Sequence, residues 1–224
     1  MVDSLSRVLH AFYPLAGRVR RTPGENKYEL FYQPGDSVVF TVAEYDGVGV
    51  DELATNDPRE VTKITQFLPN LPEGDAVLAL QVTVPLPERR GLSLGVTVHH
   101  SACDGVGSTH FLHTWATACA GAKVPPEPPV IDRTVIHDRK EIHDVFTSPM
   151  NDAKELFKSR LFAADLRTRL EPTVPGKYLG NCVGPSFALA PKKELTATDA
   201  GGLFTACATV AAAIDEVVRA QPPY

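Results

Sequence analysis

Two runs of alternating apolar and polar residues constrain the fold of this 224-residue chain more than any other feature. Every second side chain is aliphatic in residues 78–84, and the same alternation returns in residues 92–98. A period of two is typical of a β-strand with one buried face. The short link Pro85–Arg90 predicts that the two strands form an antiparallel hairpin. The chain must therefore cover the aliphatic face of a sheet with other elements.

Helices predicted on both sides of the hairpin can cover this face. The first lies near the start of the chain and ends before Pro14, with Asp3 or Ser4 as its expected N-cap. Its apolar positions recur at helical spacing, at Leu5, Val8, Leu9 and Phe12. The second follows a glycine-bearing turn, begins at about Ser108 and stops at Gly121. Strands and helices in this mixture predict an α/β fold.

Other segments carry weaker patterns. We expect strands at 27–33, 37–43, 161–166 and 178–190, a short helix from about Val61, a weak helix at 150–160 and a helix at 202–219. Five residues at 125–129 include four prolines and predict a stiff, extended linker. The expected organisation is a first domain over 1–123, a linker over 124–149 and a partial second domain over 150–224.

Charge and composition argue against several classes of protein. The net charge is −5, and no basic stripe with interleaved aromatic residues is present, so we expect no nucleic-acid partner. Four widely spaced cysteines are typical of reduced thiols rather than of a disulfide framework. No signal peptide is visible, and no apolar run is long enough for a bilayer. We therefore expect a cytoplasmic monomer with no membrane partner.

His100 is the candidate for chemistry. It follows the second strand of the hairpin, and alternation places it on the face of Val98 if the strand persists that far. A neutral imidazole held at such a junction can accept a proton near pH 7, as a general base must. Asp104 could orient the ring or brace the loop, and Gly105 could adopt backbone angles that other residues avoid. By spacing alone, a His and an Asp four apart at a turn are more typical of a satisfied structural loop than of a catalytic site.

Two other chemistries are weaker candidates. His110 and His113 share a helix face, with His99, His100 and Cys103 nearby, but the set fits no zinc pattern well, so we expect no metal. Cys103 is more typical of a small buried packing residue than of a nucleophile. No GxSxG elbow, P-loop or GxGxxG motif is present.

Five short blocks stand out along the chain. In sequence order they are Tyr13–Arg18 (YPLAGR), His100–Gly105 (HSACDG), Asp132–Ile136 (DRTVI), Asp165–Leu170 (DLRTRL) with Pro172, and Tyr178–Cys182 (YLGNC). Together these blocks resemble, in the same order, motifs of the BAHD family of plant acyl-CoA-dependent acyltransferases, whose HxxxDG motif is similar to His100–Gly105. Tyr178–Cys182 resembles the YFGNC motif of the branch that acts on anthocyanins and phenolic glucosides. Condensation domains of peptide synthetases also carry HHxxxDG, but not the YPLAGR and YLGNC blocks.

The resemblance implies a fold, a reaction and a set of site residues. The fold would be a chloramphenicol-acetyltransferase-like mixed sheet with flanking helices, here incomplete. His100 would take a proton from a hydroxyl of a phenolic or flavonoid glucoside, which then attacks acyl-CoA, with malonyl-CoA favoured. Asp104 would brace the loop by pairing with Arg167, while Gly105 shapes it. The remaining family positions are Tyr178, Gly180, Asn181 and Cys182. Acyl-CoA would be a co-substrate, and no bound cofactor is implied.

The chain also departs from the family pattern. Members are about twice as long, so we expect a truncated and internally deleted chain. A strand before the first helix, a segment between Val145 and Leu161 and a DFGWG motif near the C-terminus are missing. Missing strands would leave sheet edges unpaired. The alternative function is therefore a non-catalytic remnant that binds a ligand or partner without turnover.

Overall fold

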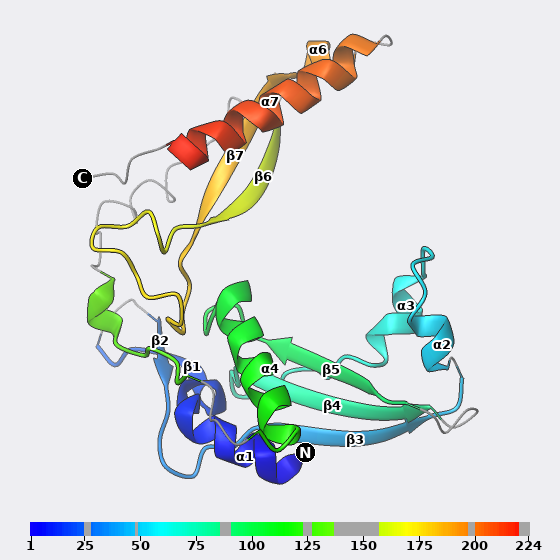
Figure 1. Cartoon of the computed structure of the whole chain (residues 1–224), viewed down its shortest axis with the longest axis vertical. Helices are drawn as coiled ribbons and strands as arrows, with labels where there is room; N and C mark the ends of the chain where they lie inside the picture. Colours follow the sequence, from blue (N-terminus) through cyan, green and yellow to red (C-terminus); the bar gives the residue numbers. More distant parts are fainter. Residues whose placement is uncertain are drawn as a thin grey trace. The chain divides into compact units, whose positions relative to one another are not determined.

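The computed structural model describes residues 1–24, 28–47, 49–85, 91–122, 127–136, 157–196 and 200–219. These residues form two compact units (Figure 1). Unit 1 comprises Met1–Ile131 and Lys177–Asn181, and unit 2 comprises Asp132–Gly176 and Cys182–Tyr224. Residues 124–126 and 137–149 of the predicted linker lie outside the described residues. The predicted domain boundaries remain a prediction.

Unit 1 begins with helix α1 (Val2–Ala11), followed by a 3₁₀ helix, η1 (Tyr13–Ala16). The helix ends before Pro14, as predicted, because proline lacks the N–H that a continuing helix needs. The predicted cap at Asp3 or Ser4 is wrong, since α1 already starts at Val2 and no side chain caps it. Ser4 is buried instead, and its hydroxyl donates to the carbonyl of Met1 at 2.7 Å.

The central sheet of unit 1 has the order β3-β4-β5. Strands β4 (Leu78–Pro85) and β5 (Ser93–Val98) are antiparallel, with Leu80 opposite Val96, which confirms the predicted pairing. Strand β3 (Val39–Tyr45) is parallel to β4, and the connection between them carries the short helices α2 (Val50–Leu53) and α3 (Val61–Thr65). A separate antiparallel pair, β1 (Arg18–Arg21) and β2 (Tyr28–Phe31), precedes this sheet.

Strand β4 is buried on both faces, although its alternation predicted only one buried face. Ala79 and Thr83, which point away from the aliphatic side, are 0% and 2% exposed. The chain at 66–69 runs across this second face: the Thr97 hydroxyl donates to the carbonyl of Pro69 at 2.5 Å. Gly95 permits this approach, because a Cβ there would lie 1.8 Å from the carbonyl oxygen of Phe67.

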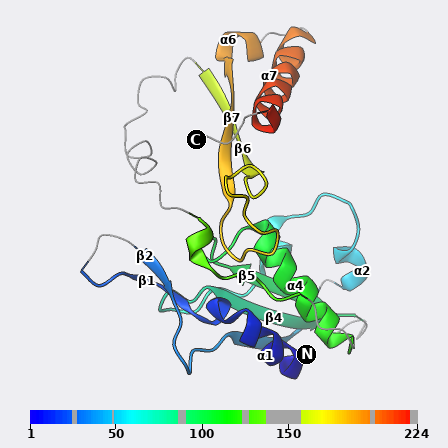
Figure 2. The ribbon, with the colours of Figure 1, turned by 60° about the vertical axis from the view of Figure 1, so that its left-hand side comes forward.

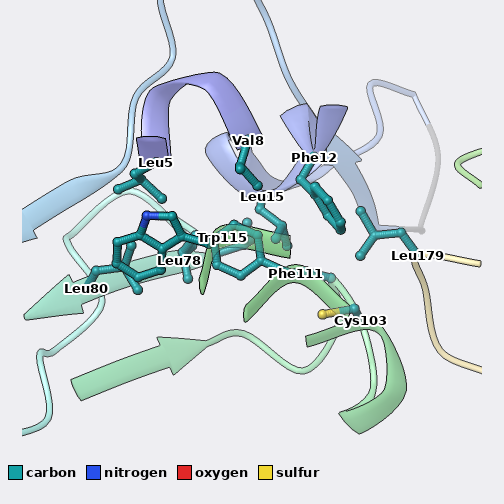
Figure 3. Close-up of a cluster of buried hydrophobic side chains, with 12 residues drawn as sticks. Leu5, Val8, Phe12, Leu15, Leu78, Leu80, Cys103, Phe111, Trp115 and Leu179 are labelled. Atoms are coloured by element: carbon teal, nitrogen blue, oxygen red, sulfur yellow. The ribbon is translucent and has the colours of Figure 1, made fainter. Parts of the chain in front are cut away.

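The hydrophobic core of unit 1 lies between the sheet and helices α1 and α4 (Gly105–Cys119) (Figure 1). Figure 3 shows side chains of both helices meeting above β4, with Leu179 from the distant 177–181 segment beside Phe12. Phe111 stacks on Trp115 with ring centroids 6.3 Å apart. Each such buried side chain contributes about 1.5–3 kcal/mol, so this cluster is the main source of stability of unit 1.

Unit 2 contains an antiparallel pair, β6 (Phe157–Asp165) and β7 (Val183–Pro191), with helix α7 (Ala200–Arg219) packed on β7 (Figure 2). The short helices η2 (Arg133–Val135) and α6 (Lys192–Leu195) also belong to the described part of this unit. The predicted weak helix at 150–160 is wrong for residues 157–160, which are strand, and 150–156 lie outside the described residues. β7 begins at Val183 rather than at 178, because residues 177–181 belong to unit 1. None of the described helices has the length and apolar character needed to cross a membrane.

Candidate functional site

His100 lies in a turn at the end of β5, and its side chain is exposed. The strand ends at Val98, the His99 N–H donates to the carbonyl of Val77 at 2.8 Å, and the Ala102 N–H closes the turn onto the carbonyl of His99 at 2.9 Å. Strand alternation therefore does not reach His100. The condition for placing His100 on the face of Val98, that the strand persists that far, is not met, because residues 99–102 form a turn.

The neighbouring His99 is used by the turn itself. Its Nδ1 accepts from the backbone N–H of Ser101 at 3.2 Å and lies 2.6 Å from the Ser101 hydroxyl. Because a backbone N–H can only donate, Nδ1 must be an acceptor, and the proton of a neutral His99 ring then lies on Nε2. Of the two adjacent histidines, His99 braces the loop and His100 is left exposed.

Asp104 caps helix α4 from a buried position. Its carboxylate accepts from the Gly107 N–H at 3.0 Å, and the residue is only 2% exposed. A carboxylate here satisfies a backbone donor and complements the positive end of the helix. The helix consequently starts at Gly105, three residues before the predicted start at Ser108, and it ends as predicted before Gly121, which has a φ of +69°.

The prediction that Gly105 adopts backbone angles that other residues avoid is wrong. The position that sterically requires a glycine is Gly107, two residues later. Gly105 is not among the positive-φ residues of the described chain, and a Cβ there would meet nothing within 4 Å. A Cβ on Gly107 would lie 2.8 Å from the Cβ of Cys103 and 3.4 Å from Leu179. Gly107 therefore allows the first turn of α4 to pack against the loop and the 177–181 segment.

Residues 177–181 hold the loop from a distant part of the sequence. Val130 anchors the segment through two backbone hydrogen bonds, donating to Lys177 at 2.9 Å and accepting from Leu179 at 2.8 Å. The carbonyl of Gly180 accepts from the Asp104 N–H at 3.3 Å. The Asn181 amide donates to the carbonyl of His100 at 2.5 Å. Residues 178–181 of the YLGNC motif thus lie against the HxxxDG motif within unit 1.

Local sequence patterns could not have identified this contact, because 81 positions separate Asn181 from His100. The other members of the motif are buried: Tyr178 at 3%, Leu179 at 1% and Cys182 at 4% exposure. Cys182 belongs to unit 2, where its carbonyl accepts from the Leu166 N–H at 2.7 Å. The only signal in the sequence was the motif itself, which carried no indication of its partner.

Arg167 lies in unit 2 and is 2% exposed. Its guanidinium and its backbone N–H both donate to the Asp165 carboxylate, at 3.1 and 3.0 Å. Within unit 2 it therefore orders the turn after β6. Asp104 belongs to unit 1, so the predicted Asp104–Arg167 pair remains a prediction.

His110, one of the histidines considered for zinc, has other contacts in the described chain. The Nε2 of His110 lies 3.0 Å from the carbonyl of Glu127, and its ring packs edge-on against Phe12. Burial lowers the pKa of the His110 imidazole, and the hydrogen bond to the Glu127 carbonyl opposes this effect only in part. The pKa is therefore lowered overall, and the neutral ring is favoured near pH 7. Among the described residues, no three His, Cys, Asp or Glu side chains gather as a metal site.

The fold resembles that of known acyltransferase structures. One is vinorine synthase, with a TM-score of 0.62 at 19% identity over 98% of this chain and 67% of that chain. Another is TRI101 of F. sporotrichioides, crystallised with coenzyme A and T-2. Its TM-score is 0.56 at 16% identity, over 96% of this chain and 63% of that chain. The predicted chloramphenicol-acetyltransferase-like α/β fold is confirmed by these similarities.

A family model, the Transferase family, matches residues 2–160, and the chain therefore belongs to this family, that of the BAHD acyltransferases. It is 33% identical, over 178 residues, to a malonyl-CoA:anthocyanidin 5-O-glucoside-6''-O-malonyltransferase of Arabidopsis thaliana, covering 73% of this chain and 39% of that protein. It is 27% identical to phenolic glucoside malonyltransferase 1 of Bemisia tabaci, and this alignment covers 96% of this chain and 63% of that protein. That alignment runs over 297 positions, more than the chain contains, so the relative has positions that this chain lacks.

The two glycines at the start of α4 provide a first test of this geometry. Gly107→Ala is expected to destabilise unit 1 by about 1–3 kcal/mol, because its Cβ would collide with the rigid Cβ of Cys103. Gly105→Ala is the matched control. It should be neutral or stabilise the helix by up to about 1 kcal/mol, since its Cβ would face open space. Urea unfolding followed by the fluorescence of Trp115, the single tryptophan of the chain, measures both variants. Equal midpoints for the two variants would contradict the packing described for Gly107.

Proposed function

We propose that this protein transfers an acyl group, with malonyl favoured, from a CoA thioester to a hydroxyl of a phenolic or flavonoid glucoside. Membership in the BAHD family supports acyl-CoA as the donor class. The names of the Arabidopsis and Bemisia relatives support malonyl and a glucoside acceptor. The observation that carries the proposal is the exposed His100, in a turn whose backbone is held by Gly180 and Asn181.

In the proposed reaction, His100 is the general base. Its imidazole takes the proton from the acceptor hydroxyl as the oxygen attacks the thioester carbonyl. The C–S bond then breaks, CoA leaves as a thiolate, and the imidazolium returns the proton to that thiolate. Asp104 does not touch substrate in this scheme, because its buried carboxylate accepts from the Gly107 N–H and braces the loop.

A second candidate is a chain that binds acyl-CoA or another ligand without turnover. The chain spans 39% and 63% of the lengths of the two malonyltransferase relatives compared above. The observation that favours this candidate is the alignment with the Bemisia relative, which runs over 297 positions and so includes positions that this chain lacks inside the aligned region. The two candidates differ in one measurable property, because both allow acyl-CoA binding but only the transferase forms an acylated acceptor.

Release of CoA thiol by the purified chain tests the proposal. Malonyl-CoA and acetyl-CoA would each be offered with a panel of phenolic and anthocyanidin glucosides, and products identified by mass spectrometry. We expect thiol release that requires an acceptor and is faster with malonyl-CoA, together with a malonylated glucoside. Thiol release without acceptor would indicate a thioesterase instead. Binding of malonyl-CoA by calorimetry with no product would favour the non-catalytic candidate.

A further inference from the structure

The side chain of Asn181 makes a contact whose role extends beyond holding the fold. Its Nδ2 donates to the backbone carbonyl of His100 at 2.5 Å, and within the described part of the chain this is the one hydrogen bond of His100. A carbonyl oxygen can only accept, so the amide must present its NH₂ group to it. We propose that Asn181 is a positioning residue, which sets the direction of the His100 imidazole. The inference rests on the proposed role of His100 as the base.

The contact acts on the peptide group that is bonded directly to the Cα of His100. Holding this carbonyl restricts ψ of His100, and ψ determines how the residue is oriented relative to the rest of the turn. The Gly180 carbonyl meanwhile accepts from the Asp104 N–H, at the other end of the same loop. Two adjacent residues thus restrain both ends of residues 100–104. Without the Asn181 contact, the loop would remain attached at Asp104 while the His100 peptide could rotate.

Asn181 is poorly placed to act as a purely structural residue. Its side chain is exposed, whereas the buried anchor of the segment is Leu179, which packs in the core and bonds to the backbone of Val130. Changing the Asn181 amide therefore removes no apolar contact from the core. The effect should fall on the geometry of His100 rather than on folding, and small displacements of a reacting group reduce rates strongly.

Asn181→Asp is the sharpest variant, because it keeps the shape but replaces the donor with a negative acceptor facing a carbonyl. We expect kcat to fall by about 10- to 100-fold, with the KM for malonyl-CoA nearly unchanged and the urea midpoint of Trp115 fluorescence unaltered. Asn181→Gln, which retains an amide donor, should recover part of the rate. Asn56→Asp, an exposed asparagine in the same unit, is the charge-matched control and should behave like the wild type.

A spectroscopic measurement tests the inference separately from turnover. In a chain with ¹³C-labelled histidine, the His100 signal among seven is identified by its disappearance in His100→Ala. Asn181→Asp is expected to shift or broaden this signal, and Asn56→Asp is expected to leave it in place. An unchanged His100 signal, or an unchanged kcat, overturns the inference. Absence of acceptor-dependent turnover in the wild type contradicts the proposed function, while the histidine spectrum still decides the role of Asn181.

Discussion

His100→Ala is expected to lower kcat/KM for acyl transfer by about 100- to 10,000-fold, the usual contribution of a general base. The side chain is exposed at the end of β5 and is not part of the core cluster, so its removal should leave the fold intact. The measurement is acceptor-dependent release of CoA thiol, with Trp115 fluorescence during urea unfolding as the check on folding. Loss of activity with an unchanged midpoint would place the effect in the chemistry.

His99→Asn is the control for this experiment. The asparagine side-chain oxygen can accept from the Ser101 N–H in place of the His99 Nδ1, as asparagine commonly does in turns. The loop should therefore keep its shape, and most of the activity should remain. If His99→Asn lost as much activity as His100→Ala, or if His100→Ala lost none, the assignment of the base to His100 would be wrong.

Phe111→Ala is expected to destabilise unit 1 by about 3–5 kcal/mol, the range for large-to-small changes at buried aromatic positions. Phe111 is 0% exposed, stacks on Trp115 and meets Phe12 with ring centroids 5.5 Å apart. Alanine would leave a cavity between α1, α4 and the sheet. A drop in the urea midpoint of Trp115 fluorescence would measure the loss within unit 1.

Tyr28→Ala supplies the comparison for the core variant. Tyr28 lies in the same unit on strand β2 and is 76% exposed, so its ring makes little contact with the rest of the unit. Its removal should change the unfolding free energy by less than about 1 kcal/mol, within the range of strand preferences. Similar losses for the two variants would show that the cluster around Phe111 does not dominate the stability of unit 1.

Much of the local structure near the site followed from sequence patterns. Alternation in 78–84 and 92–98 predicted the β4–β5 pairing, and helical spacing predicted α1 and α4. Boundaries were less accurate, since the start of α4 depends on the buried cap of Asp104 rather than on apolar spacing. The HxxxDG motif drew attention to Gly105, whereas the steric requirement for glycine lies at Gly107. That requirement can be recognised only once the positions of Cys103 and Leu179 are known.

The sequence by itself determined the family, the α/β class and the residue expected to act as the base, because these depend on motifs and on the short-range periodicity of strands and helices. Only the tertiary structure decided which distant segments of unit 1 meet, including the one that contacts that residue. It placed β3 parallel to β4, laid residues 66–69 over the second face of the sheet and brought Asn181 to the carbonyl of His100. Each of these contacts joins segments that are far apart along the chain. The pattern within either segment does not identify its partner, since these contacts arise only when the whole unit has packed.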